Sequence, residues 1–389
     1  MDSSWRGAVD GALPSEASVG VSTPRDPFSG PLGKIESWNF KVLATLMFLV
    51  TFLSLSENFT VMLVTYRFKQ LRQPLNYIIL NLSLADFLMS LIGGTISFVT
   101  NLYGYFFLGA WACVLEAFSV TYLGIVALWS LAVLAFERYF VICRPLGNIR
   151  LQGKHAALGL LFIWIFSFIW TIPPVLGWSS YTVSPIGTTC EPNWYSTEHN
   201  DHTYIIALFI TCFIMPLIVI FVSYGKLMKK LRKVASTQGR LGVARKPEKQ
   251  VTRMVIVMIL AFLFCWTPYA AFSITVTACP TIKLDPRLAA IPAFFSKTAT
   301  VYNPIIYVFM NKQFRKCLLQ MFSLTDSLLG ESNTHQTAEQ GVQIGNDREM
   351  PTIGTRSAAS SNRAEGHEVH GNCDSFAQLS IPENKVHPM

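Results

Sequence analysis

The chain has 389 residues, of which 51% are hydrophobic and only 14% are charged. Soluble domains carry roughly 25% charged residues, so this composition indicates a membrane protein rather than a soluble domain. The net charge of +8 comes from basic residues that lie between apolar segments, which favours membrane topology over nucleic-acid binding. Eight cysteines occur without any Cys-x-x-Cys pair, so neither a zinc site nor a small disulfide scaffold is indicated.

Seven apolar segments predict an all-α membrane protein, a bundle of seven transmembrane helices over residues 39–310. Each segment reaches the ~20 residues that a helix needs to cross a bilayer. Several contain prolines, which membrane helices tolerate and which are expected to kink them. The predicted spans lie near residues 40–66, 74–100, 111–141, 155–177, 203–228, 252–278 and 287–310.

The segments outside the bundle differ from it in composition. Residues 1–38 are rich in Ser, Gly, Pro and Ala, and residues 323–389 in Ser, Thr, Asn and Gly, so both are expected to be disordered tails. Between the last span and the second tail, residues 311–322 predict a short amphipathic helix on the membrane surface. The residues on its apolar face are Phe314, Leu318, Met321 and Phe322.

Basic residues predict the orientation of the bundle. Ten Lys or Arg residues fall between Lys226 and Arg253, and others follow the first and third spans, whereas 101–110 and 178–202 contain none. Because positively charged loops stay on the cytoplasmic side, the N-terminus is expected outside and the C-terminus inside. The chain is thus predicted to be a multi-pass protein of the plasma membrane.

Lys297 lies near the middle of the last predicted span, where an ammonium group costs roughly 2.5–3.5 kcal/mol on insertion scales. The side chain cannot escape by snorkelling, because about 15 Å of helix separate it from Tyr307. The amine is therefore expected to be neutral, paired with a buried carboxylate or covalently modified. An amine in a dry pocket is the reagent for a Schiff base with a carbonyl compound.

Short motifs within the predicted spans carry further information. They are Asn58, Leu80-Asn-Leu-Ser-Leu-Ala-Asp86, Glu137-Arg138-Tyr139, Cys265-Trp266-Thr-Pro268 and Asn303-Pro304-Ile-Ile-Tyr307. These motifs resemble those of rhodopsin-like G-protein-coupled receptors, and the resemblance runs from about Trp38 to Phe322. Lys297 narrows the resemblance to the opsins, whose retinal is bound to a lysine at this place. Within the opsins, the stretches Phe68–Asn76 and Cys279–Arg287 resemble the non-image-forming vertebrate ancient group.

The resemblance implies that retinal, in its 11-cis form in the dark, binds Lys297 as a protonated Schiff base with Glu116 as counterion. Glu116 lies three residues after Cys113 in an uncharged run, and a buried carboxylate needs a cationic partner or must stay protonated. A neutral, hydrogen-bonded Glu116 is the alternative. Some opsins use a glutamate in the second outer loop instead, but Ser184 occupies that position here, and Glu191 is a weaker candidate.

Cys113 and Cys190 are expected to form a disulfide that ties the second outer loop to the third span. Both lie on the oxidising side in the predicted topology. A loop held in this way would cover the pocket and keep water from the Schiff base. The alternative is a pair of free thiols.

Six residues of the third, fifth and sixth spans are candidates for the wall of the chromophore pocket. Aromatic rings suit a long apolar polyene, and a glycine leaves room beside it. By the resemblance, Trp266 contacts the ring end of retinal and senses its isomerisation. Ordinary packing between helices is the alternative for all six. The candidates are Gly124, Tyr122, Phe209, Phe213, Trp266 and Tyr269.

At the inner ends of the spans, the resemblance implies an activation switch. Arg138 cannot lose its proton, and it is expected to pair with Glu137 and Glu248 until span six swings outward. A solvated loop charge is the alternative for Glu248. The other expected switch and coupling residues are Tyr139, Tyr224, Asn303, Pro304 and Tyr307.

A buried polar core is expected between spans one, two and seven. Its members are Asn58, Asp86 and Asn303, and hydrogen bonds among them and water are expected to bias a two-state equilibrium. On the inner surface, Cys317 is a candidate for palmitoylation. Serines and threonines of the tail 323–389 are expected to be phosphorylated by a receptor kinase and then to bind arrestin, with an unmodified tail as the alternative.

The predicted function is that of a light-sensing receptor, not an enzyme. Photoisomerisation of retinal would open the inner face to a heterotrimeric G protein, with the inhibitory or transducin class favoured by the resemblance. Two other classes stay open. A receptor for a diffusible ligand would not need Lys297, and a retinal photoisomerase or retinal-binding protein would not need Glu137-Arg138-Tyr139.

Overall fold

The computed structural model describes residues 26–31, 35–143, 153–237, 246–279, 282 and 285–323. The predicted tails therefore lie almost entirely outside the described residues. Within the first of them, residues 26–31 form a turn, and the ring of Phe28 packs against that of Phe106 with 6.3 Å between centroids. This short part of the predicted N-terminal tail is thus attached to the bundle.

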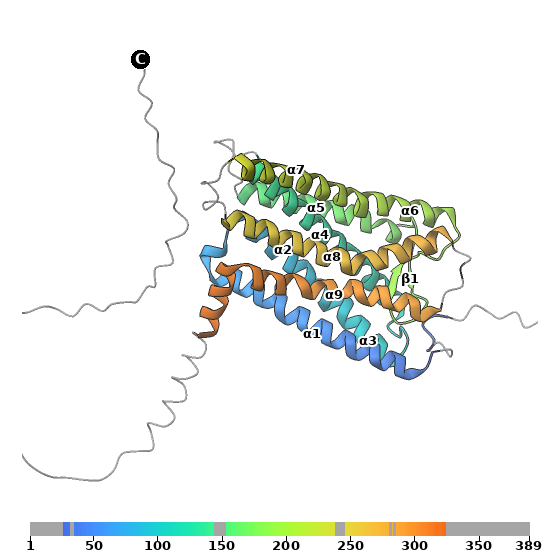
Figure 1. Ribbon diagram of the computed structural model, residues 1–389. Coiled ribbons are helices and arrows are strands. Elements are labelled where there is room, and N and C mark those ends of the chain that lie inside the picture. Colours follow the sequence, from blue (N-terminus) through green and yellow to red (C-terminus); the bar gives the residue numbers. More distant parts are fainter. Residues whose placement is uncertain are drawn as a thin grey trace, which may run out of the picture. The chain divides into compact units, whose positions relative to one another are not determined.

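The described residues form seven helical spans, which confirms the predicted fold (Figure 1). Two of them are interrupted by a π-helical turn, and short 3-10 turns, η1 (Lys69–Leu71) and η3 (Pro173–Val175), follow α1 and α5. The spans are α1 (Ser37–Arg67); α2 (Pro74–Met89), η2 (Ser90–Gly94) and α3 (Thr95–Tyr103); α4 (Gly109–Cys143); α5 (Gly153–Thr171); α6 (His199–Phe209), η4 (Ile210–Ile214) and α7 (Met215–Thr237); α8 (Lys246–Ala278); and α9 (Pro286–Met310).

Six of these spans are long and apolar enough to cross a membrane by length and hydropathy alone, and α9 is not among them. Its sequence contains Lys297, Asn303 and two internal prolines, which lower its hydropathy. These polar residues are buried inside the bundle. The surface of the bundle, by contrast, exposes large apolar side chains such as Phe52 and Phe264, as expected of helices that face lipid.

The helix α4 occupies the centre of the bundle. It contacts α2, α5, α7 and α8, and it also contacts both strands of the outer loop. The helix α9 packs along α8 on one side and contacts α1 and α2 on the other. Side chains from α4 and α9 can therefore meet in the interior, although the two helices are far apart in the sequence.

The π-helical turn η2 brings α1 unusually close to the second span. A β-carbon on Gly94 would lie 2.5 Å from Thr51 Oγ1, so only glycine permits this approach. The second π-helical turn, η4, ends at Ile214, two residues before Pro216. Because proline lacks an N–H and clashes with the preceding turn, a local change of helical pitch relieves the strain there.

A two-stranded hairpin of the second outer loop lies against the outer part of α4. Strand β1 (Tyr181–Val183) pairs antiparallel with β2 (Cys190–Pro192), with Thr182 opposite Glu191. A disulfide joins Cys190 to Cys113 of α4, which confirms the predicted bond. Since side chains alternate along a strand, Cys190 and Glu191 point to opposite faces of β2.

Residues 312–323 form the helix that was predicted after the last span. Its apolar face packs on the bundle: Phe314 is fully buried against Tyr307, with 4.6 Å between ring centroids. Cys317 is also fully buried, and its sulfur accepts a hydrogen bond from Gln70 Nε2 at 2.9 Å. In this structure the thiol is therefore buried, and its palmitoylation stays a prediction that would require the helix over residues 312–323 to expose it.

Candidate functional site

Lys297 and Glu116 form a buried ion pair in the interior of the bundle. Nζ of Lys297 on α9 lies 3.1 Å from Oε1 of Glu116 on α4. Glu116 has no exposed surface, and Lys297 is 9% exposed. Each charge would be costly alone, and each removes the need for the other to become neutral. Of the three states expected for Lys297, the structure thus contains the pairing with a buried carboxylate.

Two further groups hold Glu116 in place. Ser97 Oγ on α3 donates a hydrogen bond to Oε1 at 2.6 Å and is also in contact with Lys297 Nζ. The backbone N–H of Cys190 donates to Oε2 at 3.0 Å, so the disulfide-linked loop contacts the carboxylate directly. Sequence reasoning missed Ser97, because a serine in an apolar span usually bonds its own helix and carries no signal of a distant partner.

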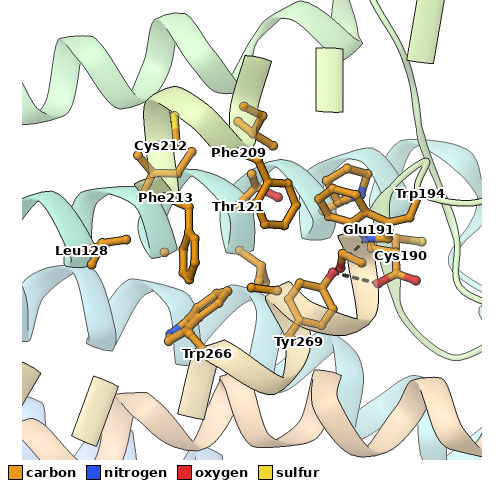
Figure 2. A pocket seen from close by; sticks show the side chains of 18 of the residues that line it. Thr121, Leu128, Cys190, Glu191, Trp194, Phe209, Cys212, Phe213, Trp266 and Tyr269 are labelled. Atoms are coloured by element: carbon orange, nitrogen blue, oxygen red, sulfur yellow. Dashed lines mark hydrogen bonds between the residues drawn. The ribbon is translucent and has the colours of Figure 1, made fainter. Parts of the chain in front are cut away.

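A large apolar cavity lies beside this pair, between α4, the fifth span, α8 and strand β2. Figure 2 shows Trp266 and Phe213 at one end and Trp194 and Glu191 towards the other. Five of the six predicted wall residues line it. They are Gly124, Phe209, Phe213, Trp266 and Tyr269.

The sixth predicted wall residue, Tyr122, does not line this cavity. Its ring packs against Trp164 and Phe168, and its hydroxyl donates to the Trp164 carbonyl at 3.2 Å. The face of α4 that lines the cavity includes Thr121 and Gly124. Because a helix turns roughly 100° per residue, Tyr122 points away from that face and towards α5. The prediction for Tyr122 was therefore wrong.

The ion pair and the large cavity are adjacent rather than continuous. Lys297 lines a smaller cavity together with Thr51, Ser90 and Thr300, and Val120 lines both this cavity and the large one. Ala117, the neighbour of Glu116, also lines the large cavity. The amine of Lys297 and the large apolar cavity are thus separated by the side chain of Val120.

Gly124 makes possible the position of Trp266. A β-carbon on Gly124 would lie 2.8 Å from Cη2 of the Trp266 ring, which is already stacked on Phe262. We expect Gly124→Ala to displace the indole and to destabilise the protein by ~1–2 kcal/mol, as overpacking does. Gly159→Ala is the matched control, because its new β-carbon meets Val133 at an ordinary 3.7 Å.

Thermal unfolding of both variants measures this difference. Alanine is the better helix former by up to ~1 kcal/mol, so Gly159→Ala should raise the melting temperature while Gly124→Ala lowers it. An equal rise in both variants would contradict the close contact between Gly124 and Trp266.

At the inner end of the bundle, Arg138 forms an ion pair with its neighbour Glu137, as predicted. The hydroxyl of Tyr224 is buried nearby and has no hydrogen-bond partner among the described residues. Lys226 lies 5.8 Å from the ring centroid of Tyr139, a cation–π contact between α7 and α4. The side chain of Glu248 lies outside the described residues, so its predicted bond to Arg138 stays a prediction.

The predicted polar core joins α1, α2 and α9. Asn303 Nδ2 donates to Asp86 Oδ2 at 3.0 Å, and Asn58 Nδ2 donates to the Thr300 carbonyl at 2.9 Å. One helical turn after Asn303, the Tyr307 hydroxyl donates to Asn76 Oδ1 at 2.8 Å. Pro304 lies inside α9 between these two contacts. The core therefore consists of three links from α9, one to α1 and two to α2.

Comparison with known proteins agrees with this architecture. The family described as 7 transmembrane receptor (rhodopsin family) matches residues 57–307. The chain is 72% identical to Opsin-VA of Rutilus rutilus, over 95% of this chain and 98% of the relative, and 74% identical to vertebrate ancient opsin of Salmo salar, over 79% and 94%. The crystal structure of squid rhodopsin has the same fold, with a TM-score of 0.70 at 24% identity over 80% of this chain and 94% of that one.

The fold and the buried lysine–carboxylate pair define a seven-helix membrane receptor. The chain belongs to the rhodopsin family of seven-transmembrane receptors and, within that family, to the opsins. It is accordingly a light-sensing receptor that couples to a G protein, not an enzyme, and its chromophore is retinal. The predictions of family, fold and chromophore are thereby confirmed.

The residues of the site fit retinal, an apolar polyene that ends in an aldehyde. The wall of the large cavity is mostly apolar and contains the rings of Phe209, Phe213 and Trp266. Lys297 supplies a primary amine one side chain away, and the Glu116 carboxylate can balance a positive charge on its nitrogen. Both chemical requirements of such a ligand, an apolar slot and an amine, are therefore met.

Proposed function

We propose that Lys297 is the attachment site of retinal and that Glu116 is the counterion of the resulting cation. The observation that carries this proposal is the 3.1 Å contact between Nζ and Oε1 in the buried interior of the bundle. Bound as a protonated Schiff base, retinal supplies absorption of visible light and a change of shape on isomerisation. Lys297 provides the attachment, and Glu116 balances the charge.

Glu116 keeps the proton on the Lys297 nitrogen, because a negative charge in contact with a cation favours its charged form. Ser97 and the Cys190 amide hold the carboxylate in a fixed direction, so no reorganisation is needed when the charge develops. The hairpin of β1 and β2, tied to α4 by the disulfide, keeps water from the pair. Exclusion of water in turn strengthens the attraction between the two charges.

Trp266 is the residue through which the pocket acts on the inner face. Its ring lies against Gly124 of α4, and its helix α8 packs along α9. A displaced indole therefore shifts α8 relative to α4 and α9. The pairing of Arg138 with Glu137 holds the closed state, and the unpartnered Tyr224 hydroxyl offers a new acceptor for Arg138 when α8 moves. Only a few kcal/mol of differential interaction are needed to exchange the two populations.

The inner surface of the bundle receives a heterotrimeric G protein of the inhibitory or transducin class. The basic residues from Lys226 to Arg253 support a cytoplasmic position of this surface in the plasma membrane, with the N-terminus outside. A receptor kinase and arrestin act on the serines and threonines of the C-terminal tail, residues 323–389. This part of the proposal rests on charge distribution and composition alone.

The test is light-dependent nucleotide exchange. The expressed protein is incubated with 11-cis-retinal in the dark, and GTP-analogue uptake by purified inhibitory-class G protein is recorded before and after illumination. We expect a visible absorption band and exchange that rises on illumination. A visible band without light-dependent exchange on any G-protein class would support a retinal-binding protein that does not signal, and it would overturn the proposal.

A further inference from the structure

A second buried acid lies in the wall of the chromophore cavity. Glu191 on strand β2 is 6% exposed and lines the large cavity directly (Figure 2). It is not part of the ion pair between Lys297 and Glu116, and the proposed function has given it no task. Burial of a carboxyl group in an apolar wall costs free energy unless the group is hydrogen-bonded. Its hydrogen-bond partners therefore indicate its role.

Three aromatic side chains hold Glu191 through a directed chain of hydrogen bonds. Trp194 Nε1 donates to the Tyr269 hydroxyl at 3.1 Å, and that hydroxyl donates to Glu191 Oε2 at 2.7 Å. The hydroxyl of Tyr195 lies 3.0 Å from the other oxygen, Oε1. Because an indole nitrogen can only donate, the single proton of Tyr269 must point to Glu191. Oε2 is therefore fixed as an acceptor, as a carboxylate requires.

Glu191 is also linked to the ion pair through its own strand. The backbone N–H of Cys190, the preceding residue, donates to Glu116 Oε2, and Glu116 Oε1 contacts Lys297. Burial raises the pKa of Glu191, while the hydroxyls of Tyr269 and Tyr195 and the positive charge of Lys297 act in the opposite direction. If the charge of Lys297 affects the ionisation of Glu191, then Glu191 must affect the charge of Lys297 equally.

We propose that Glu191 is a second acid of the chromophore site, whose negative charge stabilises the cation at Lys297 through space and thereby tunes the pigment. The inference rests on the proposed attachment of retinal to Lys297. Glu116 neutralises the cation by direct contact. Glu191 stabilises the same cation from the cavity wall, without touching it. The opsin pocket thus contains two acids for one base.

The groups that face Glu191 come from every element around it. Tyr195 and Trp194 follow β2 in the same loop, and Tyr269 belongs to α8. Lys297 on α9 is the charged group that acts on it through space, and Glu116 on α4 is linked to the same strand through the Cys190 amide. Titration of the pigment therefore reports on a coupled group of two acids and one base, not on a single residue.

The main test is the alkaline loss of the visible band in dark pigment regenerated with 11-cis-retinal. We expect the midpoint of this loss in Glu191→Gln to fall on the order of one pH unit below that of the wild type, a roughly tenfold weaker hold on the proton. Glu198→Gln is the control, because it removes the same charge from an exposed position of the same loop. Its midpoint should equal that of the wild type.

Acidification provides a second readout with a defined sign. Since burial raises the pKa of Glu191, the group becomes neutral at a higher pH than an exposed glutamate does. Neutral Glu191 and Gln carry no charge, so a difference in band position between the two pigments at neutral pH should vanish on acidification. Two spectra that coincide at every pH would overturn the proposal.

The experiment stays decisive if Glu191→Gln yields no pigment. Glu191→Ala also removes the charge, with a smaller side chain, and its alkaline midpoint should fall below that of the wild type, as in Glu191→Gln. A wild-type midpoint in Glu191→Ala would then overturn the proposal. If the wild type itself forms no visible band, the attachment to Lys297 has failed instead, so the two failures are distinguishable.

Discussion

Replacement of Lys297 by alanine should abolish the visible pigment completely. The amine is the nucleophile for the retinal aldehyde, and methyl-bearing alanine offers no bond at all. Absorption spectra of the variant purified after incubation with 11-cis-retinal should contain only the near-UV band of free retinal. Light-dependent nucleotide exchange should be lost with it.

The variant must be shown to fold, because removal of one partner of a buried ion pair leaves an unpaired charge. That loss costs about 3–5 kcal/mol when the remaining group cannot become neutral. The double variant Lys297→Ala with Glu116→Gln removes both charges and should recover most of this stability, still without a pigment. Lys41→Ala serves as the control, since Lys41 is exposed on α1 and its loss should leave the band intact. A visible band in Lys297→Ala would refute the attachment site.

Replacement of Glu116 by glutamine should move the dark absorption from the visible to the near-UV at neutral pH. The amide keeps the shape of the side chain and can still bond Ser97 and the Cys190 amide region, but it carries no negative charge to hold the proton on Lys297. The spectrum should be recorded in buffer without halide or other small anions, which would replace the lost charge.

The comparison with Glu191→Gln separates the two acids of the pocket. Glu116 contacts the amine at 3.1 Å, so its loss should have the larger effect, whereas the loss of Glu191 should shift the alkaline midpoint and leave a visible band at neutral pH. Retention of the full visible band in Glu116→Gln, together with its loss in Glu191→Gln, would reverse these roles and make Glu191 the counterion.

Much of the fold could be predicted from the sequence because a bilayer imposes strict rules. Apolar runs of about 20 residues must be helices that satisfy their own backbone hydrogen bonds, and basic loops orient them. Lys297 and Glu116 could be identified for the same reason, since a charge in an apolar run demands a partner. The disulfide between Cys113 and Cys190 was expected from the resemblance to the opsins, with both cysteines on the oxidising side of the predicted topology, and the structure contains it.

Other features depended on side chains brought together from distant parts of the chain. Ser97 contacts both Lys297 and Glu116 because α3 brings its hydroxyl to the ion pair, and this contact is visible only in the tertiary structure. Tyr122 faces α5 rather than the cavity because of the orientation of α4 about its own axis. That orientation cannot be deduced from a uniformly apolar helix. Cys317 proved to be buried because the helix over residues 312–323 packs on the core.

By itself, the sequence determined that this protein crosses a membrane seven times and contains a lysine that cannot stay unpaired there. Hydrophobic length and the cost of a buried charge are local properties, and they can be read along the chain. Only the tertiary structure decided which groups share that lysine's surroundings. Glu191 lies in the cavity wall because of its position on β2 and because the Tyr269 hydroxyl donates a hydrogen bond to it. This bond joins the second outer loop to α8, and neither segment alone contains a sequence pattern that predicts it.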